Sequence, residues 1–483
     1  MKRRLATVWG AVILALWVPL FGVAICLAIL ILQLALMVMR PIIARLPARA
    51  IDNPGPASPP WFSVHVATHA EPPDMVIRTL RALLDQDWPD RAFEIVVMDN
   101  NTRDPALWTP VQAFCAAHPG RITFLHRKNV QAAKAGALNI ALAHTAPAAT
   151  HIVTVDADYV VRRDFLSTAA AALRRTGADY VQFPQSYADT EATAPGVNAE
   201  LEEYFRTDAT NADEADAVLL TGTLCVIARD ALIRAGGWQG VTTTEDAEMG
   251  VRLCDTGHVG RFVNRIVGQG LLPMSLKDLE KQRYRWCSGN FQTLLRHSGT
   301  ILGGARRLGL QKRLAIVSQL TAWFNLTLIP CLLLLVWLAM GRESTAEVVL
   351  AASVIVLSLC DIVLRVVGRG LRDGLGWPVI CHALACRIAL APRSAMATFD
   401  ALCGKRLAFV VTDKWGKVAG RAHVAHGLLC AASLAALAAL HPVQPLVVVA
   451  LLTLALPLPA AVITDRSLRS YRASCLAARE VAA

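Results

Sequence analysis

The sequence predicts an α/β domain inserted in an α-helical transmembrane bundle. Within residues 61–156, short apolar runs typical of strands alternate with helical patterns, which favours a parallel sheet with right-handed crossovers. Long segments with almost no charge lie on both sides of that region, and 54% of the 483 residues are hydrophobic. A helix in a soluble core rarely stays apolar on every face for so long, so we expect these segments to cross a bilayer.

The apolar segments are each near the roughly 20 residues that span the hydrocarbon of a bilayer. They are Val8–Met39, Ala315–Met340, Val348–Val367, Val424–Leu440 and Leu446–Ile463. We expect the first to be one tilted helix, because it is short for two full spans; two short helices bent at Pro19 are the alternative. Its basic start resembles a signal peptide, but the apolar run exceeds the roughly 7–15 residues of one, so we expect no cleavage.

The net charge of +11 indicates the orientation in the membrane. Basic residues follow the first apolar segment and recur at 368–422 and in the C-terminal tail, whereas the loops 341–346 and 441–444 carry almost none. This distribution predicts a cytoplasmic α/β domain, a cytoplasmic 368–422 region and a cytoplasmic C-terminus. Lys2–Arg4 are an exception if the first segment spans once. No basic face interleaved with aromatic residues appears, so we expect no nucleic-acid partner.

The chain divides into four expected parts. They are an N-terminal membrane segment with a basic flank (1–50), the α/β domain (51–300), the bundle (301–465) and a cytoplasmic tail (466–483). The stretch 377–392 is apolar but short, and we expect it to be an interfacial or re-entrant helix. Twelve cysteines without a CxxC pair indicate free thiols and argue against a zinc site.

The α/β domain begins after a linker at 51–60 that is rich in Pro, Asn and Gly. Its expected strands are 61–67, 93–99, 122–125 and 152–156, and its expected helices are 72–84, 107–118 and 132–144. Ligands of parallel α/β sheets bind at the carboxyl ends of the strands. Asp99 and Asp156 both stand at such ends, so we expect them to converge on one site.

Two features near these strand ends suit a nucleoside diphosphate. Asp156 and Asp158 form a D-x-D motif, and two such carboxylates can hold a hard divalent cation with its bound phosphates. Lys134 lies near the start of a predicted helix, where a cation beside free backbone amides favours an anion. The alternatives are an ordinary polar turn for the two aspartates and a solvated helix lysine for Lys134.

Two further motifs suit the transfer of a sugar. In Thr244-Glu245-Asp246, a carboxylate can take the proton of an attacking hydroxyl, and Thr244 can cap the helix that begins there. In Gln282-x-x-Arg285-Trp286, the indole can stack on a sugar ring while Gln282 and Arg285 donate hydrogen bonds. The alternative for the second motif is a basic, aromatic helix at the membrane interface.

Together these motifs resemble the processive family 2 glycosyltransferases of the cellulose-synthase-like group. That group carries D, DxD, TED and QxxRW in this order, matched here by Asp99, Asp156/Asp158, Thr244–Asp246 and Gln282/Arg285/Trp286. Residues 409–414 also fit its FxVTxK gating loop. His69 stands where the family usually has tyrosine, and residues 99–102 resemble the β-glucan-synthesising subgroup.

The resemblance implies a GT-A type (Rossmann-like) catalytic domain with assigned residues. Nucleotide and diphosphate contacts are implied for Thr68, Glu71, Asp99, Lys134, Asp156, Asp158, Thr412 and Lys414. The implied metal is Mg²⁺ or Mn²⁺, held chiefly by Asp158 with Asp156. Asp246 is the implied general base beside Glu245, and Thr221-Gly222-Thr223 is expected near the acceptor sugar. Trp286 would stack on the acceptor, with Gln282 and Arg285 holding the acceptor end and the diphosphate.

The implied function is an inverting, processive synthesis of a β-glucan from UDP-glucose, with export across the bacterial inner membrane. The implied partners are the UDP-sugar donor, the growing polysaccharide and the lipid bilayer, with export subunits as candidates. One alternative is a non-processive transferase that adds a single sugar to a lipid or glycan acceptor. Another is a non-catalytic membrane scaffold or transporter. The residues leave open whether the sugar is glucose, N-acetylglucosamine or mannose.

Overall fold

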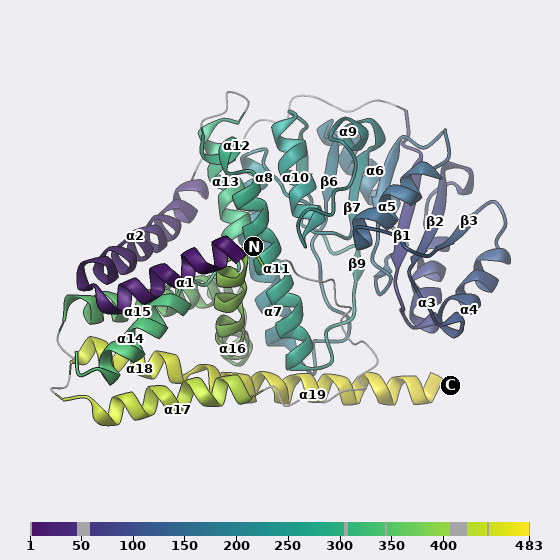
Figure 1. The fold of residues 1–483 in the computed structure, drawn as a ribbon. Helices are drawn as coiled ribbons and strands as arrows, with labels where there is room; N and C mark the ends of the chain where they lie inside the picture. Colours follow the sequence, from purple (N-terminus) through teal and green to yellow (C-terminus); the bar gives the residue numbers. More distant parts are fainter. Residues whose placement is uncertain are drawn as a thin grey trace.

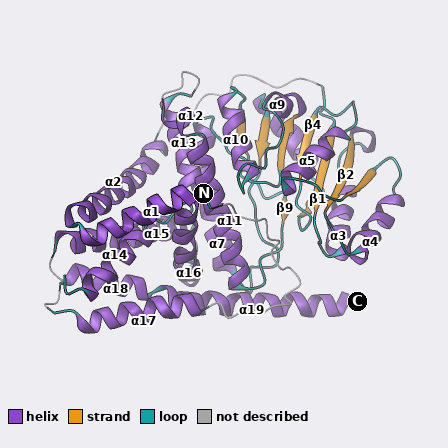
Figure 2. Ribbon diagram, viewed as in Figure 1, coloured by secondary structure: helices purple, strands orange, loops and turns teal. Residues whose placement is uncertain are grey.

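A computed structural model describes residues 2–45, 58–303, 308–342, 345–405, 423–441 and 444–482. The strands gather at one end of the molecule and the long apolar helices at the other (Figure 2). Helices α7 (Pro195–Tyr204), α11 (Leu276–Arg296) and α16 (Trp377–Leu402) stand between the two ends (Figure 1). The site described below lies where these helices meet the sheet.

The central sheet has seven strands in the order β3-β2-β1-β4-β7-β6-β8. Strands β1 (Phe62–Thr68), β2 (Phe93–Asn100), β3 (Ile122–Arg127) and β4 (His151–Thr154) are parallel. Strand β7 (Cys225–Ala228) is antiparallel to both β4 and β6 (Tyr180–Gln182), whereas β8 (Gly260–Phe262) is parallel to β6. The predicted parallel sheet is therefore correct only for its first half. Strands of three or four residues are too short to show a period, so the mixed half gave no sequence signal.

Alternating side chains of the strands supply two separate cores, because successive residues of a strand point to opposite faces. Val64 and Val97 pack with helices α3 (Pro73–Leu84), α4 (Pro105–Ala116) and α6 (Phe165–Thr176). Val96 and Met98 pack with α5 (Ala133–Ala143) on the other face. The predicted strands and helices of this half are confirmed to within a few residues at each end.

Short elements complete the α/β domain. They are η1 (Asp90–Ala92), β5 (Val160–Val161), a π-helical turn η2 (Phe205–Ala209), α8 (Thr210–Glu214), α9 (Arg229–Arg234), α10 (Glu245–Asp255), β9 (Gly268–Gln269) and α12 (Ser298–Leu302). Strands β5 and β9 pair with each other outside the central sheet. They matter because β5 begins two residues after Asp158.

The prediction of one N-terminal helix is wrong, and the alternative is correct. Helices α1 (Lys2–Trp17) and α2 (Pro19–Ile43) lie side by side and are separated by Val18, whose backbone is extended (Figure 1). Proline has no amide hydrogen and pushes the preceding residue out of the helical region, so the helix ends there. The chain turns back, and Arg4 comes to lie against Gly404 at the end of α16. The basic N-terminus is then no longer an exception to the charge rule.

The bundle contains α13 (Leu310–Thr321), α14 (Leu328–Ala339), α15 (Ala346–Arg372), α16, α17 (Val424–Ala439), α18 (Pro445–Ala455) and α19 (Pro457–Ala482). The expected span 315–340 is divided between α13 and α14. Asn325 Oδ1 accepts hydrogen bonds from the backbone N–H and the hydroxyl of Thr327, and this turn interrupts the helix. By length and composition, the described helices that can cross a membrane are Pro19–Ile43, Ala346–Arg372, Trp377–Leu402 and the α18–α19 stretch Pro445–Ala477.

Two elements extend further than predicted. Helix α16 continues past Pro392 to Leu402, lies along α7 and α11, and runs crosswise to α17 and α19 (Figure 1). By length and composition α16 can also cross a membrane, so the interfacial or re-entrant placement stays a prediction. The predicted tail 466–483 is helical as part of α19, which runs from the bundle beneath the α/β domain (Figure 1). Tyr471 and Leu468 of α19 are fully buried, because they pack into the core beneath the sheet.

Candidate active site

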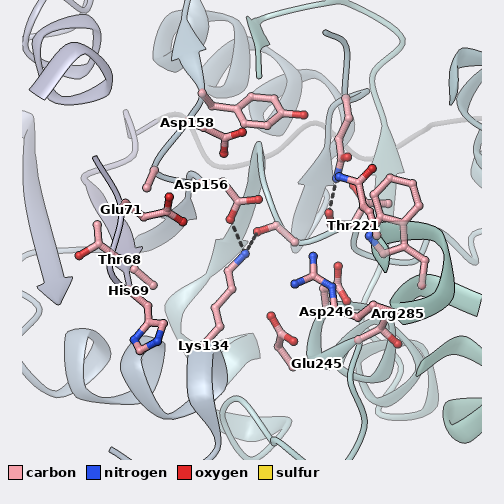
Figure 3. A pocket seen from close by; sticks show the side chains of 18 of the residues that line it. Thr68, His69, Glu71, Lys134, Asp156, Asp158, Thr221, Glu245, Asp246 and Arg285 are labelled. Atoms are coloured by element: carbon pink, nitrogen blue, oxygen red, sulfur yellow. Dashed lines mark hydrogen bonds and ion pairs between the residues drawn. The ribbon is translucent and has the colours of Figure 1, made fainter. Parts of the chain in front are cut away.

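A cleft of about 1190 Å³, open to solvent, lies at the carboxyl ends of β1 and β4. The residues that the sequence predicted for the site and that line this cleft include Thr68, Glu71, Lys134, Asp156, Asp158, Glu245, Asp246, Gln282, Arg285 and Trp286. Figure 3 shows Thr68 and Glu71 on one side, Asp246 and Arg285 on the other, and Lys134 reaching between them. The fold thus brings most of the predicted residues together from segments that are far apart in the sequence.

Lys134 joins the two sides of the cleft. Its Nζ lies 2.5 Å from Oδ1 of Asp156 and donates to the carbonyl of Gly222 at 2.8 Å (Figure 3). Burial alone would lower the pKa of Lys134, but Asp156, Glu245 and Asp246 outweigh it and raise this pKa above its usual value. Lys134 is therefore a firmly protonated cation at the start of α5, where a helix N-terminus also favours an anion.

The D-x-D loop holds its two carboxylates in different environments. Asp156 is 36% exposed in its side chain, whereas Asp158 is buried, and the Leu271 N–H lies 3.4 Å from its Oδ2. Thr79 donates to the carbonyl of Ala157 at 2.8 Å and fixes the loop from α3. Among the described residues no three His, Cys, Asp or Glu side chains gather into a metal cluster. Two carboxylates suit a cation that takes its remaining ligands from phosphates and water.

Asp99 is not brought into the cleft. Its carboxylate lies beneath the strand ends, where it accepts hydrogen bonds from the hydroxyls of Thr68 and Thr102, both at 2.9 Å. Nδ1 of His126 lies 2.9 Å from its other oxygen. The expected convergence of Asp99 with Asp156 is therefore indirect, because Thr68 rather than Asp99 lines the wall. Thr412 and Lys414 lie outside the described residues.

Asp246 stands at the first turn of α10, facing Lys134 and the Thr221–Gly222 turn. Enclosure in the cleft, and then the charge of Glu245, raise the pKa of Asp246 to about 7, although Lys134 and Arg285 oppose them. Gly222 has φ +85°, and a Cβ there would lie 2.8 Å from Oδ2 of Asp246. The predicted Thr244 cap is wrong: Thr244 occupies the cap position, but its side chain makes no capping hydrogen bond.

Helix α11 forms the wall opposite the D-x-D loop. Tyr187 donates from its hydroxyl to Oε1 of Gln282 at 3.0 Å. Trp286 lies 5.8 Å from the ring of Trp323, and both line a second cavity of about 470 Å³ that also reaches Asp246. Sequence reasoning missed Tyr187 and Trp323, which stand in no motif that was singled out. Asp246 therefore faces a polar cleft on one side and an aromatic cavity on the other.

A buried group of charges, here called the junction cluster, holds α11 to the neighbouring helices. It comprises Glu200 and Glu203 of α7, Arg283 of α11, Arg365 of α15 and Arg387 of α16. Arg283 donates to both oxygens of Glu200 at 2.9 and 2.6 Å, and its guanidinium lies 3.7 Å from the ring centre of Trp323. Burial would raise the pKa of Glu200, but Arg283 and Arg387 outweigh it and lower this pKa. The cluster was not predicted, since its members are scattered along the chain.

Comparisons with known proteins agree with this geometry. The model described as "Glycosyl transferase family 2" matches residues 63–236, and the model described as "Glycosyl transferase family group 2" matches residues 151–364. The cellulose synthase 1 catalytic subunit [UDP-forming] of Komagataeibacter xylinus is 27% identical over 292 residues, covering 58% of this chain and 37% of that protein. The cellulose synthase catalytic subunit [UDP-forming] of Xanthomonas axonopodis pv. citri is 30% identical over 275 residues, covering 55% and 36%.

A solved structure shares the fold. It is the mannosyltransferase PcManGT of Pyrobaculum calidifontis in complex with GDP-Man and Mn²⁺, with a TM-score of 0.54 and 18% identity, covering 80% of this chain and all of the other. Fold and site thus define the class: the chain is a glycosyltransferase with a GT-A-like domain. Within that class its family matches are to family 2, and it is similar to the catalytic subunits of cellulose synthases. It spans little more than a third of the length of the two cellulose synthase subunits.

Proposed function

We propose that the protein is an inverting, processive glycosyltransferase that builds a β-glucan from UDP-glucose. The observation that carries this proposal is the position of Asp246 at the boundary of two cavities. The polar cleft with Lys134 and Asp156 suits a nucleoside diphosphate sugar, and the cavity with Trp286 and Trp323 suits the end of a sugar chain. A carboxylate with a pKa of about 7 is well matched to proton transfer between them near neutral pH.

In the proposed reaction, Asp246 takes the proton of the acceptor hydroxyl as its oxygen bonds to the anomeric carbon of the donor. The bond from that carbon to the diphosphate oxygen breaks, and the configuration inverts. Lys134 and Arg285 line the cleft where the diphosphate charge would be placed. Asp158 and Asp156 would hold Mg²⁺ or Mn²⁺, which would neutralise the charge on the leaving UDP. Thr68 and Glu71 would line the nucleoside end.

The membrane helices support a further part of the proposal. The cellulose synthase relatives and the chain's own candidate spans favour a membrane enzyme that passes its product through the bundle. The distribution of basic residues supports a cytoplasmic α/β domain, and the proposed location is the bacterial inner membrane. Part of the proposal is the domain division expected from the sequence, with a membrane segment at 1–50, the catalytic domain at 51–300, the bundle at 301–465 and a cytoplasmic tail at 466–483. Export subunits remain candidate partners.

The test uses membrane vesicles that contain the full chain. UDP-glucose, UDP-N-acetylglucosamine and GDP-mannose are offered separately with Mg²⁺ or Mn²⁺, and nucleoside diphosphate release and product length are measured. Asp246→Asn is the inactive variant, and Asp255→Asn at the other end of α10 is its matched control. Long polymer from UDP-glucose, lost only in Asp246→Asn, supports the proposal. A short lipid-linked product would favour a single-sugar transferase, and no turnover of any donor would favour a non-catalytic role.

A further inference from the structure

The C-terminal helix α19 reaches the donor side of the cleft through one short segment, residues 268–274, here called the crosspiece. Its first residues form β9, which pairs antiparallel with β5, so that Gly268 lies opposite Val161. Strand β5 begins two residues after Asp158. The crosspiece is therefore fastened to the D-x-D loop at its first residues.

The middle of the crosspiece is fastened to the acceptor side of the cleft. The Gly270 N–H donates to the carbonyl of Ser186, and the carbonyl of Gly270 accepts from the N–H of Ala188, both at 2.9 Å. Tyr187 stands between these two contacts and donates to Gln282. A Cβ at position 270 would lie 2.4 Å from the ring of Tyr159, so the crosspiece packs on that ring as closely as a backbone can.

The next two amides of the crosspiece contact opposite partners. The Leu271 N–H lies 3.4 Å from Oδ2 of Asp158, and the side chain of Leu271 lines the cleft. The Leu272 N–H donates to the hydroxyl of Tyr471 at 3.3 Å. Adjacent peptide groups thus connect Asp158 on one side with the C-terminal helix on the other.

Helix α19 is well placed to hold the crosspiece still. Ala461, Leu468 and Tyr471 of α19 are fully buried, and they share one apolar core with Leu272 and Met274 of the crosspiece. The same helix continues the membrane stretch that begins in α18 and packs against α16. A helix that continues from the bundle therefore packs against the backbone that contacts Asp158.

We propose that Tyr471 is a positioning residue for the donor site. Through the crosspiece, its hydroxyl and ring hold the Leu271 amide against Asp158 and hold Tyr187 against Gln282. The ligand that benefits is a nucleoside diphosphate sugar with its divalent cation, and in this respect the inference rests on the proposed function. Loss of the hydroxyl leaves the Leu272 amide without this hydrogen bond, and the backbone that contacts Asp158 becomes more mobile. Donor binding then weakens, while the surroundings of Asp246 do not change.

The experiment compares Tyr471→Phe with Leu468→Ala in the full chain. Leu468 is buried on the same helix one turn earlier, and its aliphatic side chain cannot form a hydrogen bond to the crosspiece, so its truncation tests packing alone. Hydrogen–deuterium exchange of peptides covering 268–274 is measured without any donor. Transfer assays then give the KM for the donor, kcat and the pH midpoint of kcat.

For Tyr471→Phe we expect exchange in 268–274 to rise on the order of fivefold, the loss expected for one hydrogen bond. The donor KM should rise severalfold, and the pH midpoint should not move. Leu468→Ala should lower the melting temperature more than Tyr471→Phe while changing the donor KM less. Unchanged exchange in Tyr471→Phe, or an equal rise of KM in both variants, would overturn the proposal. Because hydrogen–deuterium exchange is measured without donor, it tests the role of Tyr471 even if the proposed sugar transfer is not observed.

Discussion

The two walls of the cleft are built in opposite ways. The donor wall consists of the loop after β4, where the side chain of Asp156 is 36% exposed, and the start of α5, where the side chain of Lys134 is 20% exposed. The acceptor wall consists of helices α7 and α11, whose Arg283 and Glu200 are each only 2% exposed. In the proposed reaction a diphosphate must enter and leave in every cycle, which suits charges that reach solvent and can exchange partners. The proposed sugar chain would only be moved along the other wall, which suits a wall fixed by buried charges.

Asp246 lies where the two walls meet, so its loss should have the largest effect. Asp246→Asn keeps the size of the side chain but cannot take a proton, and we expect kcat to fall about 10²–10⁴-fold. Donor binding should persist, because the donor wall is untouched. Single-turnover transfer and equilibrium UDP binding measure the two quantities. Retained transfer would mean that another group is the base.

Breaking the junction cluster should loosen the acceptor wall itself, because the cluster joins α7 to α11. Glu200→Ala leaves Arg283 buried without its partner, and we expect a loss of about 3–5 kcal/mol in stability. Thermal unfolding in detergent measures this loss. Arg163→Ala removes an ion pair with Asp85 that is exposed on both sides, so it should cost at most about 1 kcal/mol. Equal losses in the two variants would contradict the role assigned to the cluster.

Gly222 tests how tightly the walls meet. Gly222→Ala places a methyl group 2.8 Å from Oδ2 of Asp246 and also strains a backbone with φ +85°. Gly120→Ala is the matched control, because its φ is +76° and nothing lies within 4 Å of a Cβ there. Both variants should lose about 1 kcal/mol or somewhat more of stability from backbone strain. Only Gly222→Ala should lower kcat, by about tenfold or more. An equal kcat in the two variants would contradict a close contact between position 222 and Asp246.

The pH dependence has the smallest expected effect of these tests, but it is the simplest to measure. With a pKa of about 7 for Asp246, kcat should rise with pH through 7 and level off above about 8. Because this folded-state pKa lies above the usual value of an aspartate, the folded state holds the proton more tightly between about pH 4 and 7. The contribution of Asp246 to stability is therefore complete below pH 4 and is lost as pH rises through 7.

Asp246→Asn supplies the control for the pH prediction. The variant cannot ionise at this position, so its melting temperature should fall less between pH 5 and 8 than that of the unaltered protein. If the melting temperatures of the two proteins change with pH in the same way, the pKa of Asp246 is not raised. The same measurement on Asp255→Asn should follow the unaltered protein, since that residue lies at the far end of α10.

Much of the first half of the domain could be predicted from local pattern. The strands β1 to β4, the helices between them, and the motif residues Asp156, Asp158, Asp246 and Trp286 all stood out, because strand alternation and strand-end chemistry are properties of neighbouring residues. The turn at Pro19 could also be predicted from the sequence, since a single proline is enough to interrupt a helix. The prediction of a single N-terminal helix was wrong because it gave more weight to the length of the segment than to the effect of proline on the backbone.

The remainder depended on residues that meet only after folding. Asp99 stands at a strand end as predicted, yet the hydroxyls of Thr68 at the end of β1 and of Thr102 after β2 hold it beneath the wall. Glu200 and Arg283, or Leu272 and Tyr471, are far apart in the chain, and no periodicity relates such pairs. The sequence by itself determined which chemical groups are available and where the first strands end. Only the tertiary structure decided their surroundings, because desolvation and neighbouring charge, which set the pKa of Asp246, arise from packing.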